Sequence, residues 1–278
     1  MPDPLYPVSI VILTKNEENN LPECLASVAS ADDVVILDSG STDRTAEIAR
    51  AAGARVFTNP FKDFAQQRNF AHQNIPFKNP WVFHLDADER MTHELLTECA
   101  AITPDAAFDG YYVAPRMMFH GQWLRRCTDY PAWQARFARV NGFKFIQVGH
   151  GQRESLDMRM GFLRGAYLHD ISVPDPAEWE CKHRRYAHEE AIRYYTENRP
   201  ATAGFRAFFA GPKLARRRAL KRLSYHLPFR PLLRFLYQYI LRRGFLDGAG
   251  SYRYCRLLAR YERFAARELR EQGRILHG

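Results

Sequence analysis

Trp81-Val82-Phe83-His84-Leu85-Asp86-Ala87-Asp88-Glu89-Arg90 joins an apolar segment to three carboxylates within four consecutive positions. Residues 81–85 predict a buried strand, and the change to acids at Asp86 places the carboxylates where that strand leaves its sheet. Ligands of open α/β sheets bind at this edge. Two carboxylates separated by one small residue suit a hard divalent ion such as Mg²⁺ or Mn²⁺, which prefers oxygen ligands. The alternative is a solvated turn before a helix, whose N-terminus favours acids in any case.

The same order, an apolar strand followed by polar residues, occurs twice nearer the N-terminus. Residues 8–13 are mostly β-branched and precede a polar run and an expected helix at 21–29. Residues 34–37 form a second expected strand, and the polar run 38–43 separates it from an Ala-rich helix at 45–52, closed by Gly53.

A short strand at 54–57 and a polar helix around residues 66–69 complete the pattern before the strand at residue 81. Strand and helix alternate four times, which predicts parallel strands with right-handed crossovers and a nucleotide-binding type of half-domain. The chain contains neither Gly-x-Gly-x-x-Gly nor Gly-Lys-Ser/Thr, so it has neither a dinucleotide fingerprint nor a P-loop.

Four segments together resemble the inverting family 2 glycosyltransferases, which have a GT-A fold: an α/β fold with a Rossmann-like mixed sheet flanked by helices. The matching segments are residues 9–17, 37–45, 68–69 and 85–89. The resemblance covers roughly residues 8–190, and the order and spacing of the segments carry it. It points to the branch of lipopolysaccharide-core β-1,4-glucosyltransferases and exopolysaccharide enzymes that contain Asp-Ala-Asp-Glu.

The resemblance implies a nucleotide-diphosphate sugar donor, such as UDP-glucose, and a role for each matched residue. Asp38 would accept a hydrogen bond from the base, so that a wrong base leaves a buried polar group unmatched. Asp86 would meet the ribose or the metal shell, and Asp88 would bind the metal that bridges the diphosphate. The implied donor-binding residues are Thr14, Asn16, Glu17, Asp38, Ser41, Arg68, Asn69 and Asp86. Purely structural roles are the alternative for three residues: Asn16 and Asp43 also suit helix N-caps, and Glu17 suits an exposed capping position.

His169 ends a short apolar strand at residues 166–170. In related enzymes a histidine at this position can be the last metal ligand, and a neutral imidazole suits Mn²⁺. The expected cofactor is therefore Mg²⁺ or Mn²⁺, bound by Asp88 and His169. A structural histidine beside an acid is the alternative.

Inversion by direct displacement needs one carboxylate within hydrogen-bond reach of the acceptor hydroxyl. We expect Glu154 to be this base, because it lies in the polar segment 149–154 after an apolar run, and such loops carry function more often than packing. Asp129 is the second candidate. The structural alternative is an ion pair of Glu154 with Arg153 or Arg159.

Composition and motifs bound the organisation and location of the chain. Its 278 residues, 46% of them hydrophobic, suffice for one large core with an appendage. We expect a catalytic domain at 1–195, with a donor half at 1–100 and an acceptor half at 101–195, and a helical region at 196–278. Five dispersed cysteines favour a reducing compartment and argue against a structural zinc site. A secretion signal and a transmembrane run are not evident, which predicts a cytoplasmic protein.

Positive charge is concentrated near the C-terminus. Residues 201–278 hold 18 Lys and Arg against 4 Asp and Glu, whereas the whole chain has a net charge of +9. Arginines such as Arg216, Arg217 and Arg218 accompany an apolar and aromatic load that includes residues 232–241, which is typical of a helix in a membrane interface. A basic helical subdomain packed on the catalytic domain is the structural alternative. We expect no nucleic-acid partner, because the arginines do not line a polar groove.

These features predict an inverting glycosyltransferase of the GT-A fold with a basic C-terminal helical appendage. It would transfer a sugar from a nucleotide sugar to a lipid-linked, lipopolysaccharide or exopolysaccharide acceptor, with a metal and a carboxylate base, at the anionic inner face of the cell membrane. The alternatives are a nucleotidyltransferase of similar fold and a non-catalytic, membrane-associated protein that binds sugar nucleotides.

Overall fold

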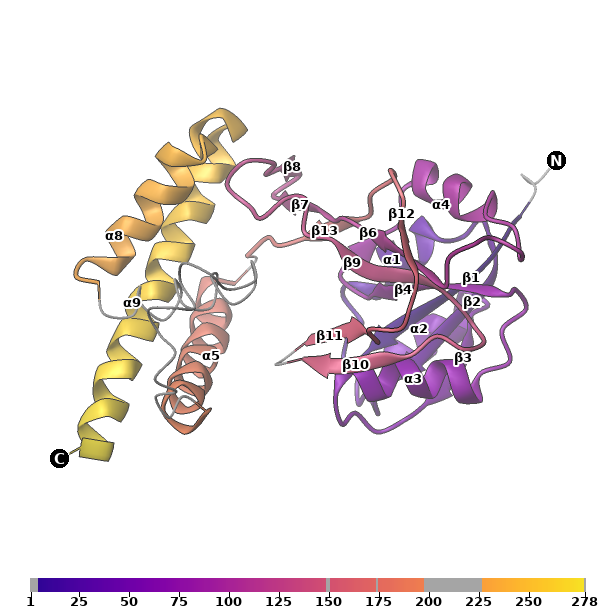
Figure 1. Cartoon of the computed structure of the whole chain (residues 1–278), viewed down its shortest axis with the longest axis horizontal. Coiled ribbons are helices and arrows are strands. Elements are labelled where there is room, and N and C mark those ends of the chain that lie inside the picture. Colours follow the sequence, from indigo (N-terminus) through magenta and orange to yellow (C-terminus); the bar gives the residue numbers. More distant parts are fainter. Residues whose placement is uncertain (1–4, 149–150, 174, 198–226, 278) are drawn as a thin grey trace. The chain divides into compact units, whose positions relative to one another are not determined.

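The computed structural model describes residues 5–148, 151–173, 175–197 and 227–277, which form two compact units (Figure 1). The first unit comprises Met1–Met118 and Tyr130–Asp170, and the second comprises Phe119–Asp129 and Ile171–Gly278. This division differs from the expected boundary at residue 195. The segment 119–129 and the long helix that follows residue 175 both belong to the second unit.

A seven-stranded mixed sheet with the order β12-β6-β9-β4-β1-β2-β3 is the centre of the first unit. Its strands are β1 (Tyr6–Thr14), β2 (Ala31–Asp38), β3 (Arg55–Thr58), β4 (Trp81–Asp86), β6 (Gly110–Val113), β9 (Gln134–Arg139) and β12 (Met160–Phe162). Within this sheet β9 is antiparallel to its neighbours β4 and β6, and the other pairings are parallel. Every strand except β9 therefore ends at the same edge, which is the edge where α/β sheets bind ligands.

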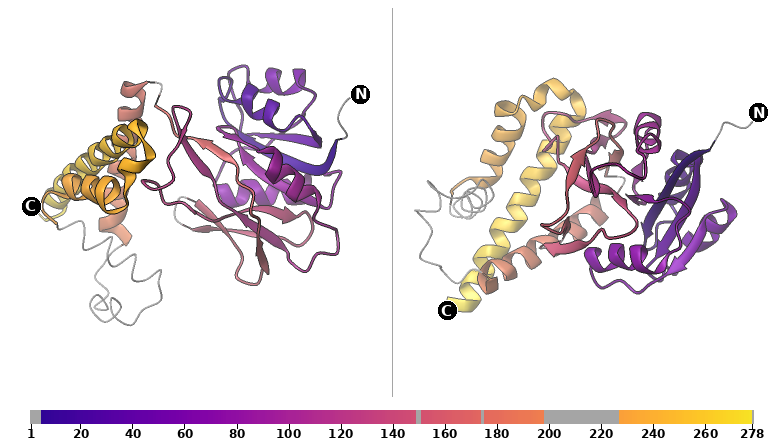
Figure 2. Two further views of the ribbon diagram at one scale, coloured as in Figure 1. Left: turned by 90° about the horizontal axis from the view of Figure 1, so that it is seen from above. Right: turned by 45° about the vertical axis from the view of Figure 1, so that its right-hand side comes forward.

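Side chains alternate along β1 and build a core on each face of the sheet. Ile10 and Ile12 lie in one cluster with residues of α1, α2 and α4, whereas Val11 lies in the other with Ala71 of α3. Helices accordingly flank the sheet on both faces (Figure 2). These helices are α1 (Leu21–Ser27), α2 (Thr45–Ala51), α3 (Phe64–Asn74) and α4 (His93–Ala100). The expected end of α2 is confirmed by Gly53, whose φ of 79° suits glycine.

One extra residue interrupts the pairing between β6 and β9. Tyr111 pairs with Phe137, but the next residue, Tyr112, pairs with Ala135, so that Arg136 is the additional residue of β9. Such a β-bulge bends its strand and re-aims a side chain, and bulges are frequent beside active sites.

Shorter strands complete the first unit. His169 of β13 (Leu168–Asp170) pairs antiparallel with Glu89 of β5 (Glu89–Arg90), and β13 runs parallel to β7 (Arg116–Phe119). The strands β10 (Phe145–Val148) and β11 (Gly151–Glu154) pair antiparallel, with Phe145 opposite Glu154. The pairing of β5 with β13 places residues that follow β4 next to His169.

The second unit is mainly helical. Ala187 of α5 (Pro176–Glu197) packs against Phe264 and Ala265 of α9 (Ala249–His277). Its other elements are β8 (Gln122–Trp123), α8 (Arg230–Phe235), a π-helical turn at Leu236–Leu241 and a 3₁₀ turn at Gly244–Asp247. The buried Asp247 carboxylate accepts hydrogen bonds from the backbone N–H groups of Arg126 (2.6 Å) and Cys127 (2.9 Å), which ties the segment 119–129 to this unit.

The expected last helix at 251–270 is part of α9. Arg216, Arg217, Arg218 and the rest of residues 198–226 lie outside the described residues. In the parts of the chain that the structure describes, no helix is both long and apolar enough to cross a bilayer.

Candidate functional site

The polar residues after β1 and β2 form one interlocked surface at the carboxyl edge of the sheet. Asp38 accepts four hydrogen bonds, from Thr14 Oγ1 (2.9 Å), Ser41 Oγ (2.5 Å), Ser41 N (2.8 Å) and Gly40 N (3.0 Å). Burial alone would raise the pKa of Asp38, but these bonds outweigh it and hold the pKa below its usual value. Asp38 therefore organises the loop as a carboxylate anion. A nucleotide base could bind to Asp38 only by replacing one of these four hydrogen bonds.

The loop after β1 is attached to the loop after β2. Asn16, in the left-handed region at φ 56°, donates its N–H to Ser41 Oγ (2.8 Å) and accepts from Thr42 N at Oδ1 (2.9 Å). The Glu17 N–H donates to Thr45 Oγ1 (2.8 Å). Asn16 is not a helix N-cap, because α1 begins after Asn20. The expected donor-binding residues Thr14, Asn16, Glu17, Asp38 and Ser41 are thus brought together.

Asp43 is also part of this attachment. Its Oδ1 accepts from Thr45 N (3.0 Å) in the first turn of α2, while its Oδ2 accepts from Glu18 N (3.2 Å). The formal N-cap position of α2 is occupied by Arg44, which makes no side-chain cap bond. Asp43 therefore stabilises the start of α2 from one residue outside it.

Asp86, at the end of β4, lies between two buried arginines. Arg68 Nη2 donates to Asp86 Oδ1 (3.0 Å), and Arg136 Nη2 donates to Asp86 Oδ2 (3.0 Å). Burial would raise the pKa of Asp86, but Arg136 and Arg68 lower it to about 2. Arg68 is 1% exposed, and among the described residues its Nε and Nη1 have no hydrogen-bond partner. The arginines make Asp86 a permanent anion.

Glu89 and Arg136 are the residues of this cluster that the sequence prediction missed. Glu89 is fully buried, with Oε1 2.8 Å from Arg136 Nη2 and Oε2 2.9 Å from the Asp86 N–H. Burial raises the pKa of Glu89 to about 8, in spite of Arg136. Arg136 also donates to the His84 carbonyl (3.2 Å) and lies over the Tyr167 ring. Two carboxylates and two arginines thus form a charged cluster at the end of β4.

The two expected metal ligands lie side by side. His169 Nε2 is 3.4 Å from Asp88 Oδ2, and its Nδ1 is 3.8 Å from Glu89 Oε1. Burial would lower the pKa of His169, but the carboxylates of Asp88 and Glu89 raise it above its usual value. This proximity follows from the pairing of β5 with β13.

The donor set fits a metal that protein and substrate hold jointly. In the described residues no three His, Cys, Asp or Glu side chains are arranged to hold a metal ion by themselves. Asp88 offers a half-exposed carboxylate, and the His169 nitrogen beside it is Nε2, 3.4 Å away. One oxygen and one nitrogen ligand leave most positions of Mg²⁺ or Mn²⁺ for diphosphate oxygens and water.

The Asn69 side chain does not contact Asp86, as its neighbour Arg68 does, but bonds to backbone groups. Its side-chain amide donates to the Phe145 carbonyl (2.8 Å) and accepts from the Phe145 N–H (2.9 Å). The amide thus joins α3 to β10, and the expected contact of Asn69 with the donor stays a prediction. The Phe145 ring in turn lies 5.9 Å from the Arg68 guanidinium.

Glu154 lies on β11, where its Oε1 accepts a hydrogen bond from the Tyr112 hydroxyl (2.5 Å). Burial, with the bond to Glu154, raises the pKa of Tyr112 to about 12. Arg159, one of the two alternative partners of Glu154, pairs with Asp109 (3.2 Å). The second candidate base, Asp129, belongs to the second unit and lies 3.6 Å from Arg242 Nη1.

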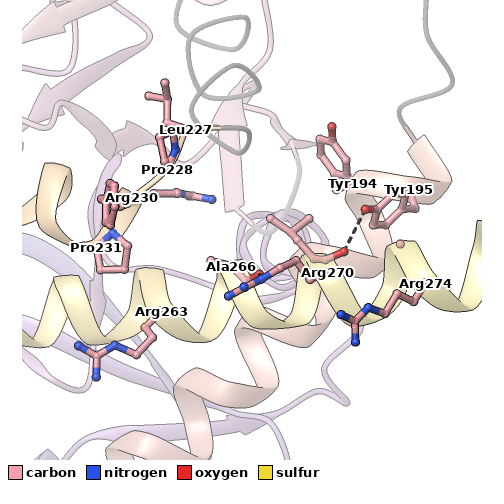
Figure 3. Close-up of a pocket in the computed structure, with 13 residues that line it drawn as sticks. Tyr194, Tyr195, Leu227, Pro228, Arg230, Pro231, Arg263, Ala266, Arg270 and Arg274 are labelled. Atoms are coloured by element: carbon pink, nitrogen blue, oxygen red, sulfur yellow. Dashed lines mark hydrogen bonds between the residues drawn. The ribbon is translucent and has the colours of Figure 1, made fainter.

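A cavity of about 1030 Å³ lies in the second unit, between α9, the end of α5 and the residues before α8 (Figure 3). Arg230 and Arg270 point toward its centre, and the Tyr195 hydroxyl closes one side by donating to the Leu269 carbonyl (2.9 Å). Its described lining contains no carboxylate or histidine. Arg230 is paired with Glu262 (2.6 Å), so the other arginines of the lining, Arg263, Arg270 and Arg274, supply its positive charge.

Two curated proteins are similar in sequence to part of this chain. The lipopolysaccharide core biosynthesis glycosyltransferase LpsC of Rhizobium meliloti (strain 1021) is 37% identical over 121 residues, which are 41% of this chain and 43% of LpsC. An uncharacterized glycosyltransferase of Rickettsia bellii (strain RML369-C) is 37% identical over 105 residues, 37% of this chain and 35% of that protein. The chain thus spans less than half the length of these curated relatives.

Solved structures are more distant. Glucosyl-3-phosphoglycerate synthase from Mycobacterium tuberculosis, in complex with Mn²⁺, UDP and phosphoglyceric acid, has a TM-score of 0.44 and 17% identity, with coverage of 68% of this chain and 78% of that one. Staphylococcus aureus TarS 1-349 with UDP-GlcNAc has a TM-score of 0.42 and 18% identity, with coverage of 90% of both chains.

The α/β fold with a mixed sheet, flanking helices and a helical C-terminal part is confirmed by the structure. Residues 9–149, just over half of the chain, match the family described as "Glycosyl transferase family 2". The matched range contains the interlocked loops after β1 and β2 and the cluster around Asp86. The chain belongs to glycosyl transferase family 2.

Proposed function

We propose that this chain transfers a hexose from a UDP-sugar, with inversion, to a hydroxyl of a lipid-linked, lipopolysaccharide or exopolysaccharide acceptor. The observation that carries the proposal is the arrangement at the end of β4. Asp88 and His169 lie 3.4 Å apart beside Asp86, a carboxylate held by two buried arginines. The name of LpsC, a lipopolysaccharide core biosynthesis glycosyltransferase, supports the class of acceptor.

The uridine part of the donor would lie against the loops after β1 and β2. Their mutual hydrogen bonds fix this surface before the donor arrives, which lowers the entropy lost on binding. Two buried nitrogens of Arg68, Nε and Nη1, make no hydrogen bond within the described part of the chain, and their N–H groups suit oxygen atoms of the ribose or the diphosphate.

Asp88 and His169 would hold Mg²⁺ or Mn²⁺ together with the diphosphate. A bound divalent ion supplies positive charge that stabilises the leaving diphosphate. Asp86 stays ionised beside this place, and Arg136 holds both Asp86 and Glu89 in position. Since Glu89 is fully buried, its role is to support Asp86 and His169 from below.

Glu154 would act as the general base. As the acceptor oxygen forms its bond to the anomeric carbon, the bond from that carbon to the diphosphate oxygen breaks, and the electron pair leaves with the diphosphate. The acceptor proton passes to the Glu154 carboxylate. Tyr112 occupies Oε1 and orients the group, so the proton would be accepted at Oε2.

An anionic membrane surface would bind the second unit. Exposed apolar and aromatic side chains gather in residues 227–246, namely Leu227, Phe229, Leu232, Leu233, Leu236, Tyr237, Ile240, Leu241, Phe245 and Leu246. Arginines are interspersed with them, and Arg270 and Arg274 add positive charge at the neighbouring cavity (Figure 3). Apolar insertion together with attraction to acidic headgroups is how peripheral proteins bind bilayers.

The proposal is tested by calorimetric titration of UDP with and without Mn²⁺. Mn²⁺ should strengthen UDP binding to the wild type, and Asp88→Asn should remove this effect. Asp109→Asn is the control, because Asp109 is a carboxylate at the opposite, amino-terminal end of β6 and should leave the titration unchanged. An Asp88→Asn protein that keeps the Mn²⁺ effect would contradict the metal assignment. Release of UDP from UDP-glucose then separates a catalyst from a non-catalytic binder.

A further inference from the structure

Aromatic side chains lie at the end of the sheet farthest from the interlocked loops. Trp133, just before β9, is 44% exposed, and Phe162, the last residue of β12, is 59% exposed. Their rings are edge to face, with centroids 5.0 Å apart. Tyr112 of β6 completes the group, because its ring lies 5.1 Å from that of Phe162. Trp133, Phe162 and Tyr112 are called the aromatic platform.

The topology places the aromatic platform at the same sheet edge as Asp86. Phe162 and Tyr112 pair with each other near the carboxyl ends of β12 and β6, and Trp133 precedes the start of the antiparallel β9. The strand order puts β9 between β4 and β6. Two strand spacings separate β4 from β6, which is about 10 Å.

A polar group borders the aromatic surface. The Tyr112 hydroxyl donates to Glu154 Oε1, so the carboxylate proposed as base is joined to a member of the platform. Aromatic rings and a hydrogen-bonding carboxylate at one place match a pyranose, which has an apolar C–H face and a rim of hydroxyl groups.

We infer that the aromatic platform is the binding site for a sugar ring of the acceptor, with the ring stacked on Trp133 or Phe162 and a hydroxyl directed to Glu154. This inference rests on the proposed function, because it supplies the acceptor side of the same reaction. The donor then occupies the edge from β3 to β4, and the acceptor occupies the edge from β6 to β12.

Other occupants fit these residues less well. A stable protein partner buries about 800 Å² on each side, whereas two half-exposed rings offer roughly 200 Å². A lipid tail would cover the rings but offers no hydrogen-bond donor to Glu154 Oε2, and covering a carboxylate with an apolar ligand is costly.

The probes for the test are methyl β-D-glucopyranoside, methyl β-D-galactopyranoside and methyl α-D-mannopyranoside, titrated by saturation-transfer NMR into the full chain with UDP and Mg²⁺. At least one glycoside should bind, with saturation strongest on its ring C–H protons. Trp133→Ala and Phe162→Ala should each weaken its affinity by about 2- to 10-fold, the effect of losing one aromatic contact. Phe108→Ala is the matched control, because Phe108 is a similarly exposed ring before the amino-terminal end of β6 and should have no effect.

UDP titrations of the same variants separate this inference from the proposed function. Intact UDP binding with no saturable glycoside, or with equal glycoside affinity in all four proteins, overturns the platform alone. Glycoside binding that depends on Trp133 without any UDP binding overturns the proposed function and leaves the platform standing. Phe162→Ala serves where Trp133→Ala does not fold. Sedimentation that shows a dimer dissociated by either substitution would assign the rings to a second copy of the chain and overturn the inference.

Discussion

Replacing Arg136 with methionine should destabilise the first unit by about 3 to 5 kcal/mol, the usual cost of removing one partner of a buried ion pair. The guanidinium gives Asp86 and Glu89 hydrogen bonds of 3.0 and 2.8 Å, and methionine can replace neither. Asp86 keeps Arg68 and is partly exposed, so most of the cost arises at the fully buried Glu89. Burial already raises the pKa of Glu89, so protonation of this carboxyl should limit the loss to the lower part of the range.

The assay is urea unfolding followed by circular dichroism and tryptophan fluorescence. Arg159→Met is the control, because Arg159 makes an exposed pair with Asp109 and should change stability by less than about 1 kcal/mol. Glu89→Gln should cost less in the Arg136→Met background than in the wild type, with a coupling free energy of at least about 1 kcal/mol. Equal losses for Arg136→Met and Arg159→Met, or additive double-mutant values, would refute the reasoning.

Three further predictions concern the base, the pH dependence of stability and the membrane surface. Glu154→Gln should lower turnover by roughly 100-fold in steady-state kinetics while UDP affinity, measured by calorimetry, stays within a few-fold. Burial alone would raise the pKa of Asp33, but hydrogen bonds, led by that from the Lys78 N–H, hold it below its usual value. Its stabilising contribution is therefore present above the unfolded-state pKa of about 4 and lost as pH falls through the lower folded-state value, so thermal unfolding of Asp33→Asn should be less sensitive to acid below about pH 4. Leu241, 76% exposed, should insert into anionic vesicles, and Leu241→Asp should reduce cosedimentation at high salt, where apolar burial dominates.

Hydrophobic periodicity made the first half of the sheet predictable. The apolar run before Asp86 and the polar run after residue 37 mark where β4 and β2 end, since an apolar strand must stop where polar side chains leave the core. The proximity of Asp88 and His169 was implied by the family resemblance. The residues alone would not have shown it, because the two are far apart in sequence and meet only through the pairing of β5 with β13.

The missed features depend on tertiary contacts. An arginine in a strand is usually exposed, and Arg136 is buried only because the bulge directs it toward two carboxylates. Asn69 stands in the matched motif, yet its amide binds backbone, a choice that depends on where Phe145 lies. The partner of α5 was also not predictable, because an amphipathic helix does not specify which apolar surface it covers.

Because of the bulge in β9, the number of residues in this strand determines where the Arg136 side chain lies. Deleting one residue near Ala135 would restore a regular ladder to β6 and satisfy backbone hydrogen bonding, yet it would withdraw the cation from beneath Asp86. An inserted residue would turn Phe137 from the core toward the opposite face. Strand β9 therefore has a fixed length requirement: the Arg136 guanidinium reaches Asp86 and Glu89 only while the strand has one residue more than its neighbour.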